Sequence, residues 1–142
     1  MAIWAMETDF GANRGKMNFF RSLATLAYDC RRSAFFKNEL MSALKIAHRG
    51  WMSPNQMRGA WAGELGQTQF LASSYLNYAV DYNGDGRRDL VRTTADVLAS
   101  TANYLKRKGW RRGGGFKQRA LAEWNKSRKY QVAIAVFAER VK

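Results

Sequence analysis

Hydrophobic residues recur along this chain mainly at helical spacing, and the alternation typical of strands is scarce. The first long helix is expected over residues 33–48, with Ser33 as its cap and Gly50 just beyond its end. Its predicted buried stripe consists of Phe36, Leu40, Leu44 and Ala47. The pattern therefore favours helices over sheets as the main building elements.

A second long helix is expected over residues 95–108, capped by Thr94 and stopped by Gly109. Its predicted buried stripe consists of Val97, Leu98, Thr101, Ala102 and Leu105. Ser127 can open a last helix, and shorter helical segments are expected after Ser53-Pro54 and over residues 70–79. Together these elements predict a mainly α fold with one domain over residues 1–142.

Composition sets outer limits on the kind of protein. A chain of 142 residues with 46% hydrophobic content can bury one core. It has no run of about 18 apolar residues that could span a bilayer. The opening MAIWAMETDF has neither a basic start nor a long apolar stretch, so it does not read as a signal peptide. The single cysteine, Cys30, excludes an internal disulfide, and we expect it to be a small core residue.

The net charge of +13 is unevenly distributed along the chain. Residues 1–104 carry 12 basic and 9 acidic side chains, whereas residues 105–142 carry 12 basic and 2 acidic ones. Such a cationic end attracts a polyanion, which could be nucleic acid, anionic lipid or an acidic cell-wall polymer. A solvated face without a partner explains the same charge, so charge alone does not choose between these classes.

Glu7 follows the apolar run AIWAM near the start of the chain. A carboxyl at the end of a mostly buried helix meets low dielectric and the negative end of the helix dipole, and both favour its protonated form. A general acid needs that form. On spacing alone, an exposed or ion-paired glutamate remains the more common outcome.

Residues 59–70, GAWAGELGQTQF, combine small residues with amides and aromatic rings. Gln67 and Gln69 offer hydrogen-bond donors and acceptors, and Trp61 and Phe70 offer stacking faces, as a sugar-binding loop requires. A turn of small residues packed beneath a helix would have the same composition.

DYNGDGRRD, residues 81–89, places Asp81, Asn83 and Asp85 at the first, third and fifth positions of an EF-hand-like calcium loop. The closing glutamate of a standard loop is replaced by Arg92, so a closing carboxylate could come only from Asp96. A hydrated Asx-turn between two helices would also explain these residues.

Six segments in the same order closely resemble the lytic murein transglycosylase B family. They are ETDFG at 7–11, LATLAYDCRR at 23–32, AGELGQTQF at 62–70, YAVDYNGDGRRDL at 78–90, ASTANYLKRKGW at 99–110 and WNKSRKY at 124–130. The resemblance covers essentially the whole chain and implies an α-helical, lysozyme-like fold. It also implies cleavage of the bond between N-acetylmuramic acid and N-acetylglucosamine without water, leaving a 1,6-anhydromuramyl end.

Position by position, the resemblance makes Glu7 the single catalytic acid and base. The implied substrate-binding residues are Gln69, Phe70, Tyr104, Asn125 and Tyr130. The implied calcium ligands are Asp81, Asn83, Asp85 and Asp96, which form a candidate site for a structural Ca²⁺; no cofactor is expected to be required. A monomer acting on peptidoglycan strands in the periplasm or cell envelope is expected, and nucleic acid is not an expected partner.

Three departures from the family pattern bear on this expectation. Ala60 replaces a usual serine, and Ala72 replaces a usual proline. The family also carries a leader and a helical region before its ETxFG segment, so the N-terminal part of the domain is expected to be missing here. Exposed apolar surface is then expected around Ile3, Trp4 and Met6. A non-catalytic peptidoglycan-binding remnant and, less favoured, a cationic nucleic-acid-binding protein are the alternatives.

Overall fold

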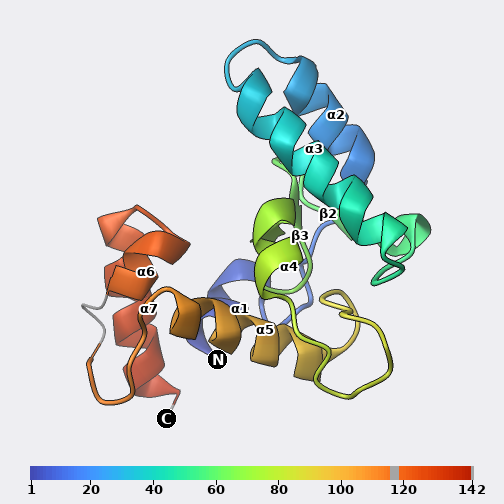
Figure 1. The fold of residues 1–142 in the computed structure, drawn as a ribbon. Helices are drawn as coiled ribbons and strands as arrows, with labels where there is room; N and C mark the ends of the chain where they lie inside the picture. The colour runs from blue at the N-terminus through green and yellow to red at the C-terminus, as the bar shows by residue number, and fades with distance from the viewer. Residues whose placement is uncertain (116–118, 142) are drawn as a thin grey trace.

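The computed structural model describes residues 1–115 and 119–141, and its main elements are helices (Figure 1). The α-helices are α1 (Ala2–Thr8), α2 (Phe19–Tyr28), α3 (Ser33–His48), α4 (Ala72–Tyr78), α5 (Thr94–Arg107), α6 (Arg119–Trp124) and α7 (Arg128–Arg140). A 3₁₀ turn, η1 (Pro54–Gln56), follows Ser53 as expected. The mainly α prediction is confirmed.

A small antiparallel sheet, which the hydrophobic pattern did not predict, holds the middle of the chain together. It consists of β1 (Met17–Asn18), β2 (Arg58–Gly59), β3 (Glu64–Leu65) and β4 (Phe70–Leu71), in that spatial order. Strands of two residues are too short to show a period of two in the sequence. The sheet needs glycine at position 59, because an added Cβ would lie 2.0 Å from the Glu64 carbonyl oxygen.

The larger hydrophobic cluster is built by α2 to α5 and the sheet, and α2 and α3 form an antiparallel pair at the top of Figure 1. Its buried members are Phe19, Leu23, Ala27, Phe36, Ala43, Ile46, Met52, Met57, Leu65, Phe70, Ala72, Tyr75, Ala79, Leu90, Val91, Val97 and Tyr104. Fully buried aromatic and aliphatic side chains make this cluster the main source of stability.

The predicted stripe of α3 is partly wrong. Leu44 is 47% exposed, and the buried face instead carries Phe36, Glu39, Ala43 and Ile46. Glu39 can be buried because its carboxylate accepts hydrogen bonds from the Ser73 amide at 2.8 Å and the Ser73 hydroxyl at 2.7 Å. Ser33 does not cap the helix, since its hydroxyl donates to the Ala27 carbonyl.

The predicted stripe of α5 needs a similar correction. Val97 and Thr101 are buried, but Ala102 is exposed. The buried face also includes the polar residues Asp96 and Ser100, which hydrogen-bond to neighbouring segments and are therefore tolerated in the core. The N-cap position is occupied by Thr93, one residue before the expected Thr94, without a side-chain capping bond. The apolar pattern did not predict the buried face of α5 because that face includes polar side chains with hydrogen-bond partners.

A second, smaller cluster joins the two ends of the described chain. Ala2 and Ile3 of α1 pack with Leu121 of α6 and Ile134 of α7, which lie together on the left of Figure 1. The expectation of an exposed Ile3 is therefore wrong, because its side chain is only 6% exposed; Met6 is exposed as expected. Ser127 caps α7 as predicted, accepting a hydrogen bond from the Tyr130 amide.

Cys30 lies outside both clusters. It is exposed, so the prediction of a core cysteine is wrong. The turn that carries it is held by Arg31 and Asp29, whose side chains form an ion pair at 2.9 Å. Within the residues described, no helix combines the length and the apolar character needed to cross a membrane.

Candidate active site

A cleft of about 530 Å³ opens between the two clusters, and the residues predicted for catalysis and substrate binding gather around it. Five of them line it: Glu7, Gln69, Phe70, Tyr104 and Asn125. They come from α1, the turn into β4 and its first residue, α5, and the corner between α6 and α7. Segments far apart in the sequence therefore supply the walls of one cavity.

Glu7 stands one residue before the end of α1, with its carboxylate held from the opposite end of the chain. Its Oε1 accepts a hydrogen bond from the Tyr130 hydroxyl and one from Trp124 Nε1 at 3.3 Å. Glu7 Oε2 has no hydrogen-bond partner among the described residues. One oxygen is thus fixed by the protein, and the other is available to a bound molecule.

Tyr130 is the predicted substrate-binding residue that lies outside the lining of the cleft, behind Glu7. Burial, reinforced by the hydrogen bond to Glu7 and by its charge, raises the pKa of the Tyr130 hydroxyl well above its usual range. The hydroxyl therefore stays protonated and keeps donating to Glu7 Oε1. In this structure Tyr130 orients the carboxylate directly.

Gln67 ties α1 to the body of the protein. Its Oε1 accepts from Trp4 Nε1 at 2.8 Å, and its Nε2 donates to the Val91 carbonyl at 3.0 Å. Its own carbonyl oxygen accepts from the Thr8 hydroxyl at 2.5 Å. Of the two interpretations of residues 59–70, Gln67 therefore fits the packed turn, because it is 4% exposed and its amide is already used inside the protein.

Gln69 and Phe70 line the same cleft as Glu7. Gln69 has a positive φ of 55°, and its Nε2 donates to the Gly66 carbonyl at 2.8 Å. A non-glycine residue held in the left-handed region is typical of functional sites. Phe70 is only 2% exposed and packs edge-on against Tyr104 and Trp124. It forms the floor of the cleft and is not the open stacking face that was expected.

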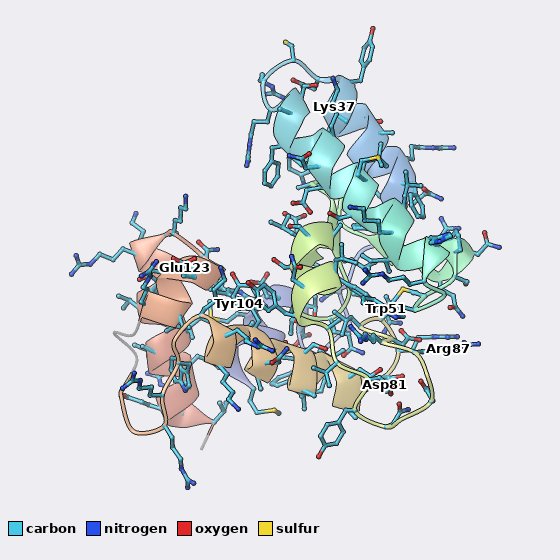
Figure 2. All side chains as sticks on the ribbon, in the orientation of Figure 1. Lys37, Trp51, Asp81, Arg87, Tyr104 and Glu123 are labelled. Carbon is cyan, nitrogen blue, oxygen red and sulfur yellow. The ribbon has the colours of Figure 1, made fainter. Side chains whose placement is uncertain are left out.

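Tyr104 and Asn125 shape the end of the cleft at α6. The Tyr104 hydroxyl donates to the Glu123 carbonyl at 2.8 Å, and Figure 2 shows both residues where α5 approaches α6. Burial raises the pKa of Tyr104, so this donor also stays protonated. Asn125 Oδ1 accepts from the Ser127 amide, and its carbonyl accepts from Gln131 Nε2. Both residues therefore fix the corner that carries Trp124 towards Glu7.

Two functional-looking residues escaped the sequence analysis. Trp124 opens the segment WNKSRKY, but only the fold reveals that its indole bonds to Glu7. Glu64 lies on β3 and lines the same cleft. Burial raises the pKa of the Glu64 carboxyl; its own backbone amide opposes this, and the charge of Glu7 adds to the rise. The spacing of residues along the sequence did not indicate that Glu64 lies near Glu7.

The calcium-loop residues lie on the long connection from α4 to α5, where Figure 2 labels Asp81 and Arg87. The Asp81 carboxylate accepts hydrogen bonds from the amides of Gly84 at 2.7 Å and Gly86 at 2.8 Å. Asn83 Nδ2 donates to Asp85 at 3.1 Å. The loop thus closes around Asp81, with Asn83 and Asp85 beside each other.

Asp96 is placed differently from the other three expected ligands. It is fully buried, and its two oxygens accept from the amides of Tyr82 and Asp89, both at 2.9 Å. Across residues 1–115 and 119–141, no three His, Cys, Asp or Glu side chains are grouped so that they could hold a metal ion. The oxygen-rich loop has the donor type that calcium prefers, and the four-residue ligand set stays a prediction.

Comparison with known proteins identifies relatives over nearly the whole chain. Residues 1–129 match the Transglycosylase SLT domain. Membrane-bound lytic murein transglycosylase B of Escherichia coli is 39% identical over 114 residues, which are 80% of this chain and 31% of that protein.

Solved structures agree with this match. SltB3 from Pseudomonas aeruginosa, in complex with NAG-anhNAM-pentapeptide, is 32% identical with a TM-score of 0.88, covering 96% of this chain and 54% of that one. Escherichia coli Slt35 in complex with calcium is 27% identical with a TM-score of 0.85, covering 99% of this chain and 66% of that one. The expected lysozyme-like fold is confirmed, and the chain spans only part of these relatives.

Proposed function

Because the chain belongs to the Transglycosylase SLT domain family, we propose that it cleaves murein glycan strands between N-acetylmuramic acid and N-acetylglucosamine without consuming water. The product would carry a 1,6-anhydromuramyl end. The observation that supports this most directly is the carboxyl of Glu7, anchored through Oε1 by Tyr130 and Trp124 and lying in a cleft wide enough for sugars.

Glu7 acts first as an acid. The proton on Oε2 passes to the glycosidic oxygen as the bond from that oxygen to C1 of the muramyl sugar breaks. The sugar's own N-acetyl oxygen stabilises the cation-like C1. The two donors on Oε1, Tyr130 and Trp124, stabilise the carboxylate that remains on Glu7.

Glu7 then acts as a base. Its Oε2 takes the proton of the 6-hydroxyl while that oxygen forms the new bond to C1 of the same sugar. The carboxyl is restored to its starting form, and no water enters the balance. One acid therefore suffices, in contrast to glycosidases that use a pair of carboxylates.

Gln69 and Asn125 line the cleft beside Glu7 and offer amide groups to the sugar hydroxyls. The relative SltB3 has been solved in complex with NAG-NAM-pentapeptide, which supports a glycan as the ligand of this cleft. Asp81, Asn83 and Asp85, with Asp96, whose carboxylate bonds to the loop at the Tyr82 amide, would hold a structural Ca²⁺ that stiffens the loop; the relative Slt35 has been solved with calcium. We place the protein's action in the periplasm or cell envelope.

Purified sacculi test the proposal. The chain is incubated with them, and the released muropeptides are analysed by mass spectrometry. We expect 1,6-anhydro products from the unmodified protein and a loss of about 10²-fold or more in Glu7→Gln, because the acid step is removed. Glu139→Gln, an exposed glutamate on α7, is the matched control and should retain release.

Other outcomes separate the alternatives. Products with reducing ends would mean that water is the nucleophile, and release that survives Glu7→Gln would remove the assignment of the acid. Binding to sacculi without any release would favour the non-catalytic remnant. Salt-sensitive DNA binding without sacculus binding would favour the nucleic-acid class.

A further inference from the structure

Glu64 is a carboxylate in the cleft that the proposed reaction does not use. It sits on β3, whose backbone is fixed by pairing with β4 and by the hydrogen bond from the Ala60 amide to the Glu64 carbonyl at 3.0 Å. Within the described part of the chain, its carboxylate has no hydrogen bond to another residue and forms no ion pair. An acid on a rigid strand is thus aimed into a cleft without a partner.

The surroundings of Glu64 increase the cost of its negative charge. Burial raises its pKa, and the like charge of Glu7 raises it further. Arg32 lines the same cleft but lies 4.3 Å from the centre of the Phe35 ring and forms no ion pair with Glu64, while Lys108 and Arg119 contact Glu123. In a protein of net charge +13, this leaves a local site of unneutralised negative charge.

Trp61 provides the second half of a recognition site. It precedes Glu64 by three residues in the turn between β2 and β3, lines the same cleft and is 69% exposed. A cation over an open indole face is attracted by the ring, and a charge-assisted hydrogen bond to a nearby carboxylate adds to that attraction. This pair of groups suits a primary ammonium better than a neutral acetamide.

We propose that Glu64, together with Trp61, binds a primary ammonium group carried by the glycan strand. The inference rests on the proposed function in one respect, namely that the cleft takes a glycan. The ammonium can belong to a glucosamine that lacks its N-acetyl group or to an amine on the attached peptide, and both present the same chemistry. Binding would neutralise the charge of Glu64, which raises the electrostatic repulsion with Glu7.

Calorimetric titration with matched ligands tests this proposal. A glucosamine tetramer is compared with an N-acetylglucosamine tetramer at a pH where the sugar amine is protonated. We expect Glu64→Gln to weaken binding of the glucosamine tetramer about tenfold and to leave the acetylated tetramer unchanged. Trp61→Ala should weaken both, and Glu139→Gln should weaken neither.

The source of the ammonium is decided by a second pair of ligands. A disaccharide-pentapeptide containing lysine is titrated with its side-chain amine free and then acetylated. If the protein prefers the free lysine amine and Glu64→Gln removes that preference, the ammonium belongs to the peptide. If the protein shows no such preference but does prefer the glucosamine tetramer, the ammonium belongs to the sugar. Equal effects of Glu64→Gln on amine and acetylated ligands would overturn the inference while leaving the glycan function intact. Failure of the unmodified protein to bind any of the four ligands would instead count against the glycan function itself.

Discussion

The two hydrophobic clusters divide the candidate active site between a strongly packed and a weakly packed region. Seventeen buried residues form the larger cluster, whose sheet carries Glu64 and Phe70. Four described residues form the smaller cluster, whose helices carry Glu7 and Tyr130. The sheet side of the cleft is therefore part of the main core, whereas α1 reaches that core only through the partly buried Trp4.

Polar bonds compensate for the weak packing of α1. Trp4 and Thr8 both bond to Gln67, which belongs to the body of the protein, and Glu7 bonds to Tyr130 and Trp124. Hydrogen bonds fix geometry more strictly than apolar contacts do, but each contributes only about 1 kcal/mol to stability. Losing contacts in the small cluster should therefore impair catalysis before it unfolds the protein.

The largest expected effects come from one cavity in each cluster. Leu23→Ala, at a fully buried site of the large cluster, should lower the free energy of unfolding by about 2–5 kcal/mol. Ile134→Ala in the small cluster should lower the free energy of unfolding by about 2 kcal/mol, near the lower end of that range, because fewer buried residues surround it. Urea unfolding and muropeptide release measure both. Equal destabilisation with full activity in Ile134→Ala would contradict the proposed division.

Gln67→Leu should have the next largest effect and lower the free energy of unfolding by about 2 kcal/mol. The change leaves the indole of Trp4 and the carbonyl of Val91 without their partner in a buried setting. Turnover should fall, while binding of an N-acetylglucosamine oligomer should persist because the wall is untouched. Thr8→Val, which removes a second bond to Gln67, should also lower turnover. If either variant loses binding before it loses turnover, Gln67 supports the glycan-binding wall and not the position of Glu7.

Tyr130→Phe should reduce the rate of release about tenfold without changing oligosaccharide affinity. The lost hydroxyl both orients Glu7 and stabilises its carboxylate, and a hydrogen bond to a charged group accounts for an effect of this size. Tyr28→Phe, which changes a 93% exposed tyrosine, is the matched control. If affinity falls in place of rate, Tyr130 contacts the glycan and does not position the acid.

Two helix caps, one at each cluster, should each contribute about 1 kcal/mol to the stability of the protein. Asn18 caps α2 at the large cluster, and Ser127 caps α7 at the small one. Asn18→Ala and Ser127→Ala should cost similar stability in thermal melts. Only Ser127→Ala should lower the rate of release, since α7 positions Tyr130. A drop in rate from both variants would mean that the two regions are mechanically coupled.

The smallest expected effect depends on pH. Because the folded protein raises the pKa of Glu64, its neutral form is favoured by folding, and the stability this provides is present at acid pH and lost as pH rises through the raised value. Glu64→Gln should therefore raise the melting temperature at neutral pH. The gain should vanish at a pH below the ordinary value for glutamate. A gain that is constant with pH would have a cause other than ionisation.

Local sequence determined the helices whose ends carry strong signals. Ser127 and the glycines at 50 and 109 mark boundaries of α3, α5 and α7, because capping and positive φ are properties of a few neighbouring residues. The faces of α3 and α5 were less predictable. Glu39 and Asp96 are buried only because distant amides satisfy their carboxylates, and no apolar pattern records such partners.

The sequence by itself also determined the family, and with it Glu7 as the candidate acid, because motifs in a fixed order can be recognised without knowing the fold. Only the tertiary structure decided how that acid is held. Tyr130 lies 123 residues from Glu7 along the chain, and Glu64 enters the same cleft from β3. Hydrogen bonds and charge coupling act through space, so contacts between such distant positions have no signature in the spacing of either residue.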